Sequence, residues 1–339
     1  AYSFGLKEVR MDSVSQLVLG AAVGIAVMGK RTPVWKAALA GAVCGTLPDL
    51  DVFYDHGDAI SNMTMHRTES HALFYLTLIS PLLAWLMAKL FSAGQHFRHW
   101  WGAVWLALIT HPLLDLMTVY GTQLGLPFTN YPFAVGSIFI IDPLYTLPLI
   151  IGVGLALYRE QQRGIMWNNV LLGVSCLYLA CTVVEQHQVT RHVGEELQRQ
   201  NIESTQVLVT PTPLNTLVWR VVVMNKDSYG EGFTSLLHPD SPIRFRFYPR
   251  GEALYEAHKD NAFMARVAWF SHGFFSVKEQ GGHILISDLR MGQEPDYSFV
   301  FDLGDMKAGA APELPVKVAS ARPSATKMWQ QFRQALDVE

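Results

Sequence analysis

Charged side chains, cysteines and nucleotide-binding motifs are scarce in this sequence. Asp, Glu, Lys and Arg make up 16% of its 339 residues and the net charge is only -3, which argues against a nucleic-acid partner. The three cysteines lie in apolar runs, so neither a disulfide framework nor a cysteine-based zinc site is expected. The sequence contains no glycine-rich phosphate loop and no Gly-x-Ser-x-Gly motif, which disfavours the P-loop and α/β-hydrolase classes.

Apolar residues are abundant but unevenly distributed. They make up 50% of the chain, and the long apolar runs lie within residues 14–184, whereas 185–339 has the composition of a soluble domain. The first ten residues, AYSFGLKEVR, lack an apolar core, so no cleavable signal peptide is expected. The sequence therefore predicts a membrane-embedded helical domain at 11–184, followed by a soluble region.

About six membrane segments are predicted, of which the first two are short. A helix that crosses a bilayer needs about 20 mostly apolar residues. The stretches that meet this length are 70–91, 100–119, 138–158 and 165–184. Shorter stretches near 14–28 and 36–48 either cross with help from their neighbours or enter the membrane and return. Their glycines suit close helix packing in lipid: Gly20, Gly24, Gly41 and Gly45.

The Lys and Arg residues of the loops set the expected orientation. The loops at 29–36, 89–99 and 159–164 carry Lys and Arg. The loop at 120–137 has neither, and the loop at 49–69 is acidic apart from one arginine. Loops rich in Lys and Arg stay on the cytoplasmic side. We therefore expect a multi-pass protein of the bacterial inner membrane whose C-terminal half emerges in the periplasm.

The second half is expected to be a small, mainly-β domain. A polar helical connector is predicted at 185–210. Within 211–310 the segments VWRVVVM, PIRFRFY, HILISDL and DYSFVFDL have the period of two that is typical of strands. The tail at 311–339 places Met328, Phe332 and Leu336 on one face of a short amphipathic helix. The predicted fold class is an α-helical polytopic membrane domain followed by an extracytoplasmic β domain.

Polar clusters interrupt the membrane half near the outer ends of the predicted segments. They are LPDLD at 47–51, HRTESH at 66–71, HPLLD at 111–115 and IIDP at 140–143. His111 and Asp115 are four residues apart and share one helix face. Because a lone ionisable side chain in lipid costs about 3 kcal/mol or more, several that converge need a compensating charge. One or two divalent cations would supply it, and imidazole with carboxylate suits zinc first, and also manganese or iron.

Each candidate side chain also has a simpler explanation. Asp49 and Asp51 could instead cap a helix end, and His66 could lie at the lipid–water interface. Arg67 either anchors to lipid headgroups or binds a substrate phosphate. Glu69 is either a solvated charge or a general base.

The alternatives for the later clusters are a buried hydrogen bond and a helix cap. His111 and Asp115 could form a hydrogen-bonded pair without a metal. Asp142 could cap a helix, pair with Arg67 or bind a metal. The clusters favour a metal site chiefly because they converge on one side of the predicted membrane domain.

Five stretches together carry a family resemblance. They are MDSVSQLVLGAAVG (11–24), GTLPDLD (45–51), HRTESHA (66–72), THPLLDLMTVYGTQL (110–124) and IFIIDPLYTLP (138–148). In this order they resemble the YdjM-like family, described as LexA-binding, inner-membrane-associated proteins with an inferred metal-dependent hydrolase activity. PTPLNTLVWRVV and WFSHGFF look like extended members with a C-terminal domain.

The resemblance implies which side chains hold the metal. The implied ligands are Asp49, Asp51, His66, His71, His111, Asp115 and, less directly, Asp142. This sequence departs from the family pattern in its first helix. Gln16 stands where some members carry His, and Ile25 stands where many carry an acidic residue. A ligand from the first helix is therefore not expected here.

The leading functional hypothesis is a membrane-embedded metal-dependent hydrolase acting at the outer face of the inner membrane. Its amphiphilic substrate would be a phospholipid or a lipid-linked phosphoester, cleaved by a metal-activated water. Glu69 would shuttle a proton and Arg67 would bind the phosphate. Two other classes stay open. One is a non-enzymatic transporter, since ion and proton paths also use intramembrane His and Asp. The other is a membrane regulatory protein with a structural metal and a partner-binding β domain.

Overall fold

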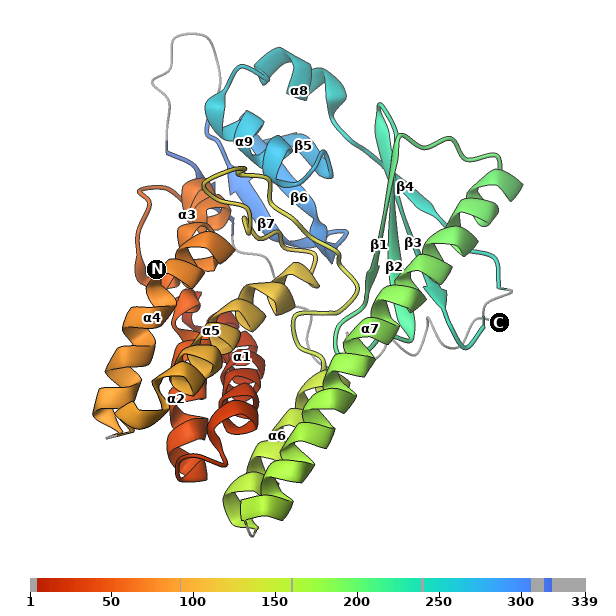
Figure 1. Cartoon of the computed structure of the whole chain (residues 1–339). Coiled ribbons are helices and arrows are strands. Elements are labelled where there is room, and N and C mark those ends of the chain that lie inside the picture. Colours follow the sequence, from red (N-terminus) through yellow and green to blue (C-terminus); the bar gives the residue numbers. More distant parts are fainter. Residues whose placement is uncertain (1–4, 92, 160, 239–240, 306–313, 319–339) are drawn as a thin grey trace. The chain divides into compact units, whose positions relative to one another are not determined.

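Helices fill the first half of the chain and two β-sheets fill most of the second. Figure 1 shows the computed structural model, which describes residues 5–91, 93–159, 161–238, 241–305 and 314–318. The chain divides into two compact units. The first unit comprises Ala1–Tyr54, Arg67–Val184 and Pro213–Asn215, and the second comprises Asp55–His66, Glu185–Thr212 and Thr216–Glu339.

The first unit is a bundle of helices around one apolar core. Its long helices are α1 (Gly5–Met28), α2 (Val34–Thr46), α4 (Leu73–Leu90), α5 (Phe97–Leu116), α6 (Pro143–Tyr158) and the first half of α7 (Gln161–Arg199). Its short 3-10 turns are η1 (Pro48–Phe53), η2 (Glu69–His71) and η3 (Gly94–His96). Helix α1 packs against α2, α5 and α6, and α4 packs against α5. Trp100 and Leu108 of α5 are fully buried in the core.

Glycines allow α1 and α2 to touch along their backbones. A Cβ atom on Gly41 would lie 2.1 Å from the carbonyl oxygen of Gly20, and a Cβ atom on Gly24 would lie 2.3 Å from the carbonyl oxygen of Ala37. No real Cβ contact is that short, so only glycine fits at these positions. This contact confirms the close packing that the glycine spacing predicts.

Adding one methyl group to this contact is expected to destabilise the helix pair. Gly41→Ala should lower the free energy of unfolding by about 1–3 kcal/mol or more, because neither backbone can move without disturbing the core. Gly102→Ala on α5 is the matched control, since nothing lies within 4 Å of the Cβ that it would add. Unfolding of the full-length protein in detergent, followed by tryptophan fluorescence, measures both variants. Equal stability of the two variants would contradict the tight contact.

The prediction of about six membrane segments is wrong in number. Within the described residues, two helices are long and apolar enough to cross a membrane by length and composition, namely α4 and α7. Helices α2 and α6 are apolar but shorter. Helix α6 starts only at Pro143, so the apolar residues before it lie outside the helix. Helix α5 has sufficient length, but polar side chains such as Arg98, His111 and Asp115 lower its hydropathy.

The two candidate spans expose apolar side chains rather than bury them. Only 22% of the most apolar window of α4 and 17% of that of α7 is buried. Leu78 and Leu177, for example, are 64% and 66% exposed. A soluble protein rarely exposes so much contiguous apolar surface, so these faces suit a lipid environment.

The second unit confirms the predicted β domain. One antiparallel sheet has the order β1 (Gln206–Pro211), β2 (Val218–Met224), β3 (Ser228–Ser235) and β4 (Arg246–Pro249). The other has the order β5 (Phe275–Gln280), β6 (His283–Gln293), β7 (Asp296–Asp302) and β8 (Val316–Lys317). The helices of this unit are α3 (Ala59–Met65), α8 (Glu252–His258), α9 (Ala262–Phe270) and the second half of α7.

Strand β2 lies at the centre of this unit, and all its residues are buried. Trp219, Val221 and Val223 share a cluster with Val189 and Val193 of α7. The alternate residues Val222 and Met224 pack in a cluster with side chains of the second sheet. Because side chains alternate along VWRVVVM, one face of β2 packs against α7 and the other face packs against the second sheet.

A buried polar network ties the two sheets together. Glu231 of β3 pairs with Arg220 of β2, and its Oε1 accepts a 2.6 Å hydrogen bond from the hydroxyl of Tyr297 on β7. Arg220 also donates to the carbonyl oxygen of Leu289 at 2.9 Å. Burial raises the pKa of Glu231, but Arg220 and the Tyr297 hydroxyl outweigh it and lower that pKa. The carboxylate is therefore charged and paired inside the domain.

The sequence also predicts two segments on either side of the β domain. The range predicted as a polar helical connector, 185–210, holds the second half of α7, which continues unbroken to Arg199, and the start of β1 at Gln206. The amphipathic helix predicted in the tail lies outside the described residues.

Candidate metal centre

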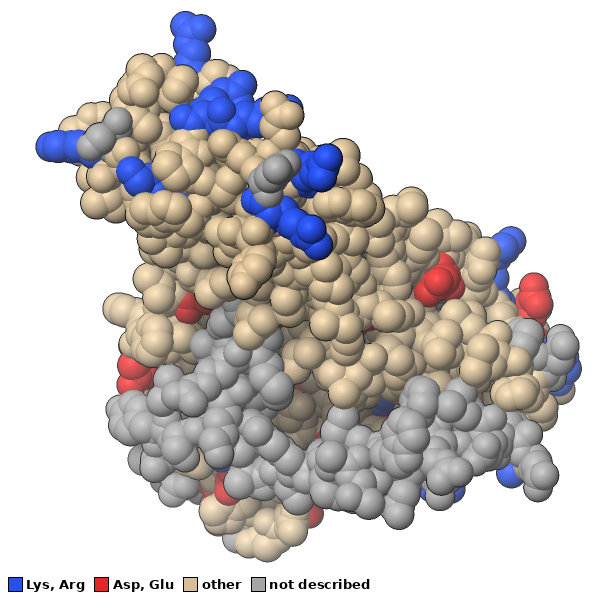
Figure 2. All heavy atoms as spheres, turned by 90° about the horizontal axis from the view of Figure 1, so that it is seen from below, with Lys and Arg blue, Asp and Glu red and all other residues tan. Residues whose placement is uncertain are grey.

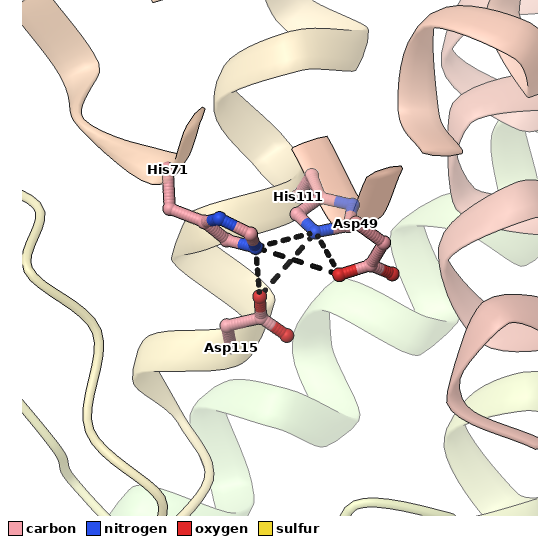
Figure 3. A group of neighbouring side chains, drawn as sticks. All are labelled: Asp49, His71, His111 and Asp115. Carbon is pink, nitrogen blue, oxygen red and sulfur yellow. Dashed lines mark hydrogen bonds and ion pairs between the residues drawn. The ribbon is translucent and has the colours of Figure 1, made fainter. Parts of the chain in front are cut away.

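Side chains from three segments of the first unit converge on one point. Asp49 comes from η1, His71 from the end of η2, and His111 and Asp115 from α5 (Figure 3). Pro48 occupies the first position of η1, where its fixed φ favours a helical turn directly after α2. The spacing of four residues puts His111 and Asp115 on one face of α5. We call these four residues the metal cluster.

Five distances between the ligand atoms of the cluster are close to the edge lengths of a tetrahedral metal site. His71 Nε2 lies 3.1 Å from His111 Nε2. The distances from Asp49 Oδ1 are 3.5 Å to His71 Nε2 and 3.2 Å to His111 Nε2. Those from Asp115 Oδ2 are 3.2 Å and 3.4 Å to the same nitrogens. Tetrahedral ligands bound at 2.0–2.1 Å are separated by about 3.3 Å, so these edges fit a single zinc-sized cation.

His111 is oriented by a backbone carbonyl group. Its Nδ1 lies 2.6 Å from the carbonyl oxygen of Gly45, which can only accept a hydrogen bond. The Nδ1–H group is therefore committed to this carbonyl, and Nε2 is the nitrogen that faces the carboxylates. Metal-binding histidines commonly use their second nitrogen in this way.

The cluster is buried and rich in negative charge. His71, His111 and Asp115 are at most 1% exposed, whereas the Asp49 side chain is 13% exposed. Two carboxylates with so little access to solvent call for positive charge, and a divalent cation fits a set of two carboxylates and two imidazoles.

Arg67 supplies one positive charge beside the cluster. It is 2% exposed, and its Nη2 lies 3.1 Å from Asp115 Oδ1. Gln16 donates to the same oxygen at 3.0 Å, so Asp115 is left with Oδ2 facing the imidazoles. The guanidinium also lies over the ring of Tyr120 at 5.0 Å. The residue has a φ of 66°, an uncommon backbone conformation for a side chain of this size.

The other predicted site residues lie outside the cluster. Asp51 Oδ2 is 3.6 Å from His71 Nδ1, the nitrogen on the far side of the ring. Asp142 is the N-cap of α6, where its side chain accepts from the backbone of Leu144 and Tyr145. Glu69 begins η2 and is exposed, while His66 ends α3 in the second unit. The Tyr178 hydroxyl donates to the other oxygen of Asp142 at 2.8 Å.

Three residues at the site were not predicted as part of it. They are Gln16, Gly45 and Ser70, which touch Asp115, His111 and His71 respectively. Gln16 occupies the position noted as a departure from the family pattern, and Ser70 lies inside the HRTESH motif. No local pattern in the sequence identifies Gly45, because it acts through its backbone.

The basic loops gather at the opposite ends of the helices from the cluster. Gln161 donates to the carbonyl oxygen of Gly29 at 2.7 Å, and Lys36 Nζ lies 3.4 Å from the carbonyl oxygen of Phe91, so the three loops adjoin. Figure 2 shows Lys and Arg side chains collected at this end. The cluster lies where α2 and α5 end and shortly before α4 begins. One end of the bundle is therefore basic and the other holds the metal cluster.

Comparisons with known proteins agree with the motif resemblance. A family profile described as "YdjM inner membrane protein" matches residues 11–189, which include the whole metal cluster. The chain is also 24% identical over 306 residues to the uncharacterized protein YfhP of Bacillus subtilis (strain 168), an alignment that covers 86% of this chain and 90% of YfhP. No solved structure matches the chain.

Proposed function

Since this chain belongs to the YdjM inner membrane protein family, we propose that it is a metal-dependent hydrolase of lipid-carried phosphoesters at the outer face of the membrane. One observation carries the proposal: two imidazoles and two carboxylates converge at the spacing of metal ligands, with one carboxylate reachable by solvent. Bringing several ionisable side chains together inside a protein costs folding free energy. Such a convergence therefore favours a functional site.

Asp49, His71, His111 and Asp115 would hold the cation. A divalent cation in such a site polarises a phosphoryl oxygen and lowers the pKa of a nearby water. Zinc is the first choice for two imidazoles and two carboxylates, and manganese or iron would accept the same donors with room for further ligands. Asp49 lies at the reachable side, so we place the substrate there.

The neighbouring charged residues take separate roles in this proposal. Arg67 is held on Asp115, so we assign it the task of balancing and orienting that carboxylate, in place of direct phosphate binding. Glu69 is exposed and lies two residues before His71, which suits a proton shuttle between the site and solvent.

Apolar side chains beside Asp49 support an amphiphilic substrate. Leu50 and Phe53 lie on the same 3-10 turn as Asp49 and are 55% and 68% exposed. A phosphate headgroup at Asp49 would leave acyl chains against these side chains. A water-soluble phosphoester gains nothing from such a surface.

The basic loops support the orientation. Because Lys and Arg loops stay in the cytoplasm, the metal cluster would lie near the outer leaflet. The apolar half of α7 starts at the basic end, so the chain after it would emerge in the periplasm. The second unit would therefore be periplasmic.

Turnover of defined lipids tests the proposal. The full-length protein, reconstituted in vesicles and supplied with Zn²⁺, Mn²⁺ or Fe²⁺, should release products from a phospholipid or a lipid-linked phosphoester, measured by mass spectrometry. Chelation or Asp49→Asn should reduce turnover at least 100-fold, as expected when a charge-stabilising group is lost. Leu39→Ala, at an exposed apolar residue of α2, is the control and should leave turnover unchanged.

A structural metal is the competing function, and one observation favours it. Four protein ligands would complete a tetrahedral zinc site and leave no position for substrate. Cobalt substitution separates the two functions, because tetrahedral Co²⁺ absorbs visible light much more strongly than five- or six-coordinate Co²⁺. A spectrum that does not change on adding inorganic phosphate, with no lipid turned over, would contradict the hydrolase.

A further inference from the structure

A chain of hydrogen bonds lies behind His71, on the side away from the metal cluster. His71 Nδ1 is 2.8 Å from Ser70 Oγ, and Ser70 Oγ is 2.7 Å from Asp51 Oδ2. The backbone N–H of Arg67 donates to the same Asp51 oxygen at 3.0 Å. His71 is fully buried and the Asp51 side chain is 14% exposed, so water competes little with these bonds.

The chemistry of these groups fixes where each hydrogen lies. An ionised carboxylate only accepts, so the Ser70 hydroxyl hydrogen points to Asp51. The Ser70 oxygen is then free to accept, and the group placed to donate to it is His71 Nδ1–H. The proton of His71 is thereby held on Nδ1, and Nε2 is left to face the cluster.

We propose that Asp51 and Ser70 are positioning residues, which act through His71 by holding its proton on Nδ1. Asp51 is thus not a metal ligand, although the family resemblance implies that it is. Two neighbouring aspartates of one 3-10 turn thus have different roles. Asp49 lies on the Nε2 side of His71, where the cation would bind, and Asp51 lies on the Nδ1 side.

The ring protons of His71 and His111 are fixed on Nδ1 in different ways, because the groups that accept them differ. A carbonyl oxygen can only accept, so Gly45 alone fixes the proton of His111. A hydroxyl group can donate or accept, so Ser70 alone would leave His71 free to hold its proton on either nitrogen. The carboxylates of Asp49 and Asp115 near Nε2 would draw the proton to that nitrogen, where it blocks metal binding. Asp51 accepts the hydrogen bond from the Ser70 hydroxyl, so the Ser70 oxygen can only accept from His71 and the ring proton stays on Nδ1.

The inference rests on the metal site of the proposed function but not on hydrolysis, so metal affinity is the measurement. Calorimetric titration of the full-length protein with Zn²⁺ should show Ser70→Ala binding about 10- to 100-fold more weakly than wild type, the usual effect of losing such a partner. Ser70→Thr should restore affinity, because it returns the hydroxyl. Ser80→Ala is the matched control: Ser80 is a buried hydroxyl of α4 that bonds Trp101 and lies outside the cluster.

A spectroscopic readout separates positioning from a general loss of structure. In ¹⁵N-histidine spectra of the metal-free protein in bilayers, at a pH where His71 is neutral, wild type should show the proton on Nδ1. Ser70→Ala should shift it to Nε2, with the signal assigned by its loss in His71→Gln. Asp51→Asn keeps an acceptor oxygen and should retain one equivalent of zinc.

The outcomes distinguish the failures. Wild-type affinity in Ser70→Ala, or a proton that stays on Nδ1, would overturn the positioning role. Loss of zinc in Asp51→Asn to the extent seen in Asp49→Asn would make Asp51 a ligand. A wild-type protein that binds no metal overturns the proposed function itself.

Discussion

Replacing His111 with alanine is expected to abolish metal binding. The change removes one of four donors and leaves the Gly45 carbonyl group without the bond that it accepts from Nδ1. The loss of affinity should exceed the 10- to 100-fold, or about 1.4–2.7 kcal/mol, that is usual for an outer partner. Elemental analysis of purified protein measures it: wild type should carry one equivalent or more of zinc, manganese or iron, and His111→Ala none.

His99→Ala is the matched control for this experiment. His99 lies on the same helix but is exposed, and it belongs to the basic end of the bundle. It should keep its metal. If neither wild type nor any variant binds metal, even after metal is added back, His111 and Asp115 are a buried hydrogen-bonded pair and the hydrolase proposal falls.

Replacing Arg67 with methionine is expected to destabilise the metal-free protein strongly. Methionine fills similar space but leaves the buried Asp115 carboxylate without its guanidinium partner. Breaking a buried ion pair on one side costs about 3–5 kcal/mol. Bound metal should recover part of this loss, because it supplies positive charge to the same carboxylate. Unfolding free energies measured with and without Zn²⁺ give both values.

Arg98→Met is the control, since Arg98 is exposed at the start of α5. A double variant, Arg67→Met with Asp115→Asn, should be less destabilised than the sum of the single changes, because it removes both charges. Strict additivity, or an Arg67→Met protein as stable as Arg98→Met, would show that the pair contributes nothing.

The sequence allowed the centre of the site to be predicted, because its chemistry conflicts with its surroundings. His111 and Asp115 stand four residues apart in an apolar helix, and this spacing alone puts them on one face. The glycines of α1 and α2 likewise predicted a close helix contact. The family motifs indicated Asp49 and His71 as well. These parts depend on local periodicity, which a single sequence displays.

The sequence did not show which of the remaining candidates reach the cluster. Asp49 and Asp51 are two residues apart, and only the tight 3-10 turn decides that they face opposite sides of His71. Asp142 has the residue pattern of a helix cap, an aspartate before a proline, and this local role holds in the structure. The number of membrane segments was overestimated because apolar composition does not reveal where helices begin.

Gly45 belongs both to the helix contact and to the metal site. A Cβ atom there would lie 2.9 Å from Gly20 Cα, and the carbonyl group of the same residue orients His111. Any slide of α2 along α1 therefore moves the acceptor that sets one metal ligand. Helix pairs adjust their tilt and packing to bilayer thickness. The affinity of the site for its cation should then vary with the thickness of the bilayer around the protein. Metal occupancy would thereby report on the surrounding lipids.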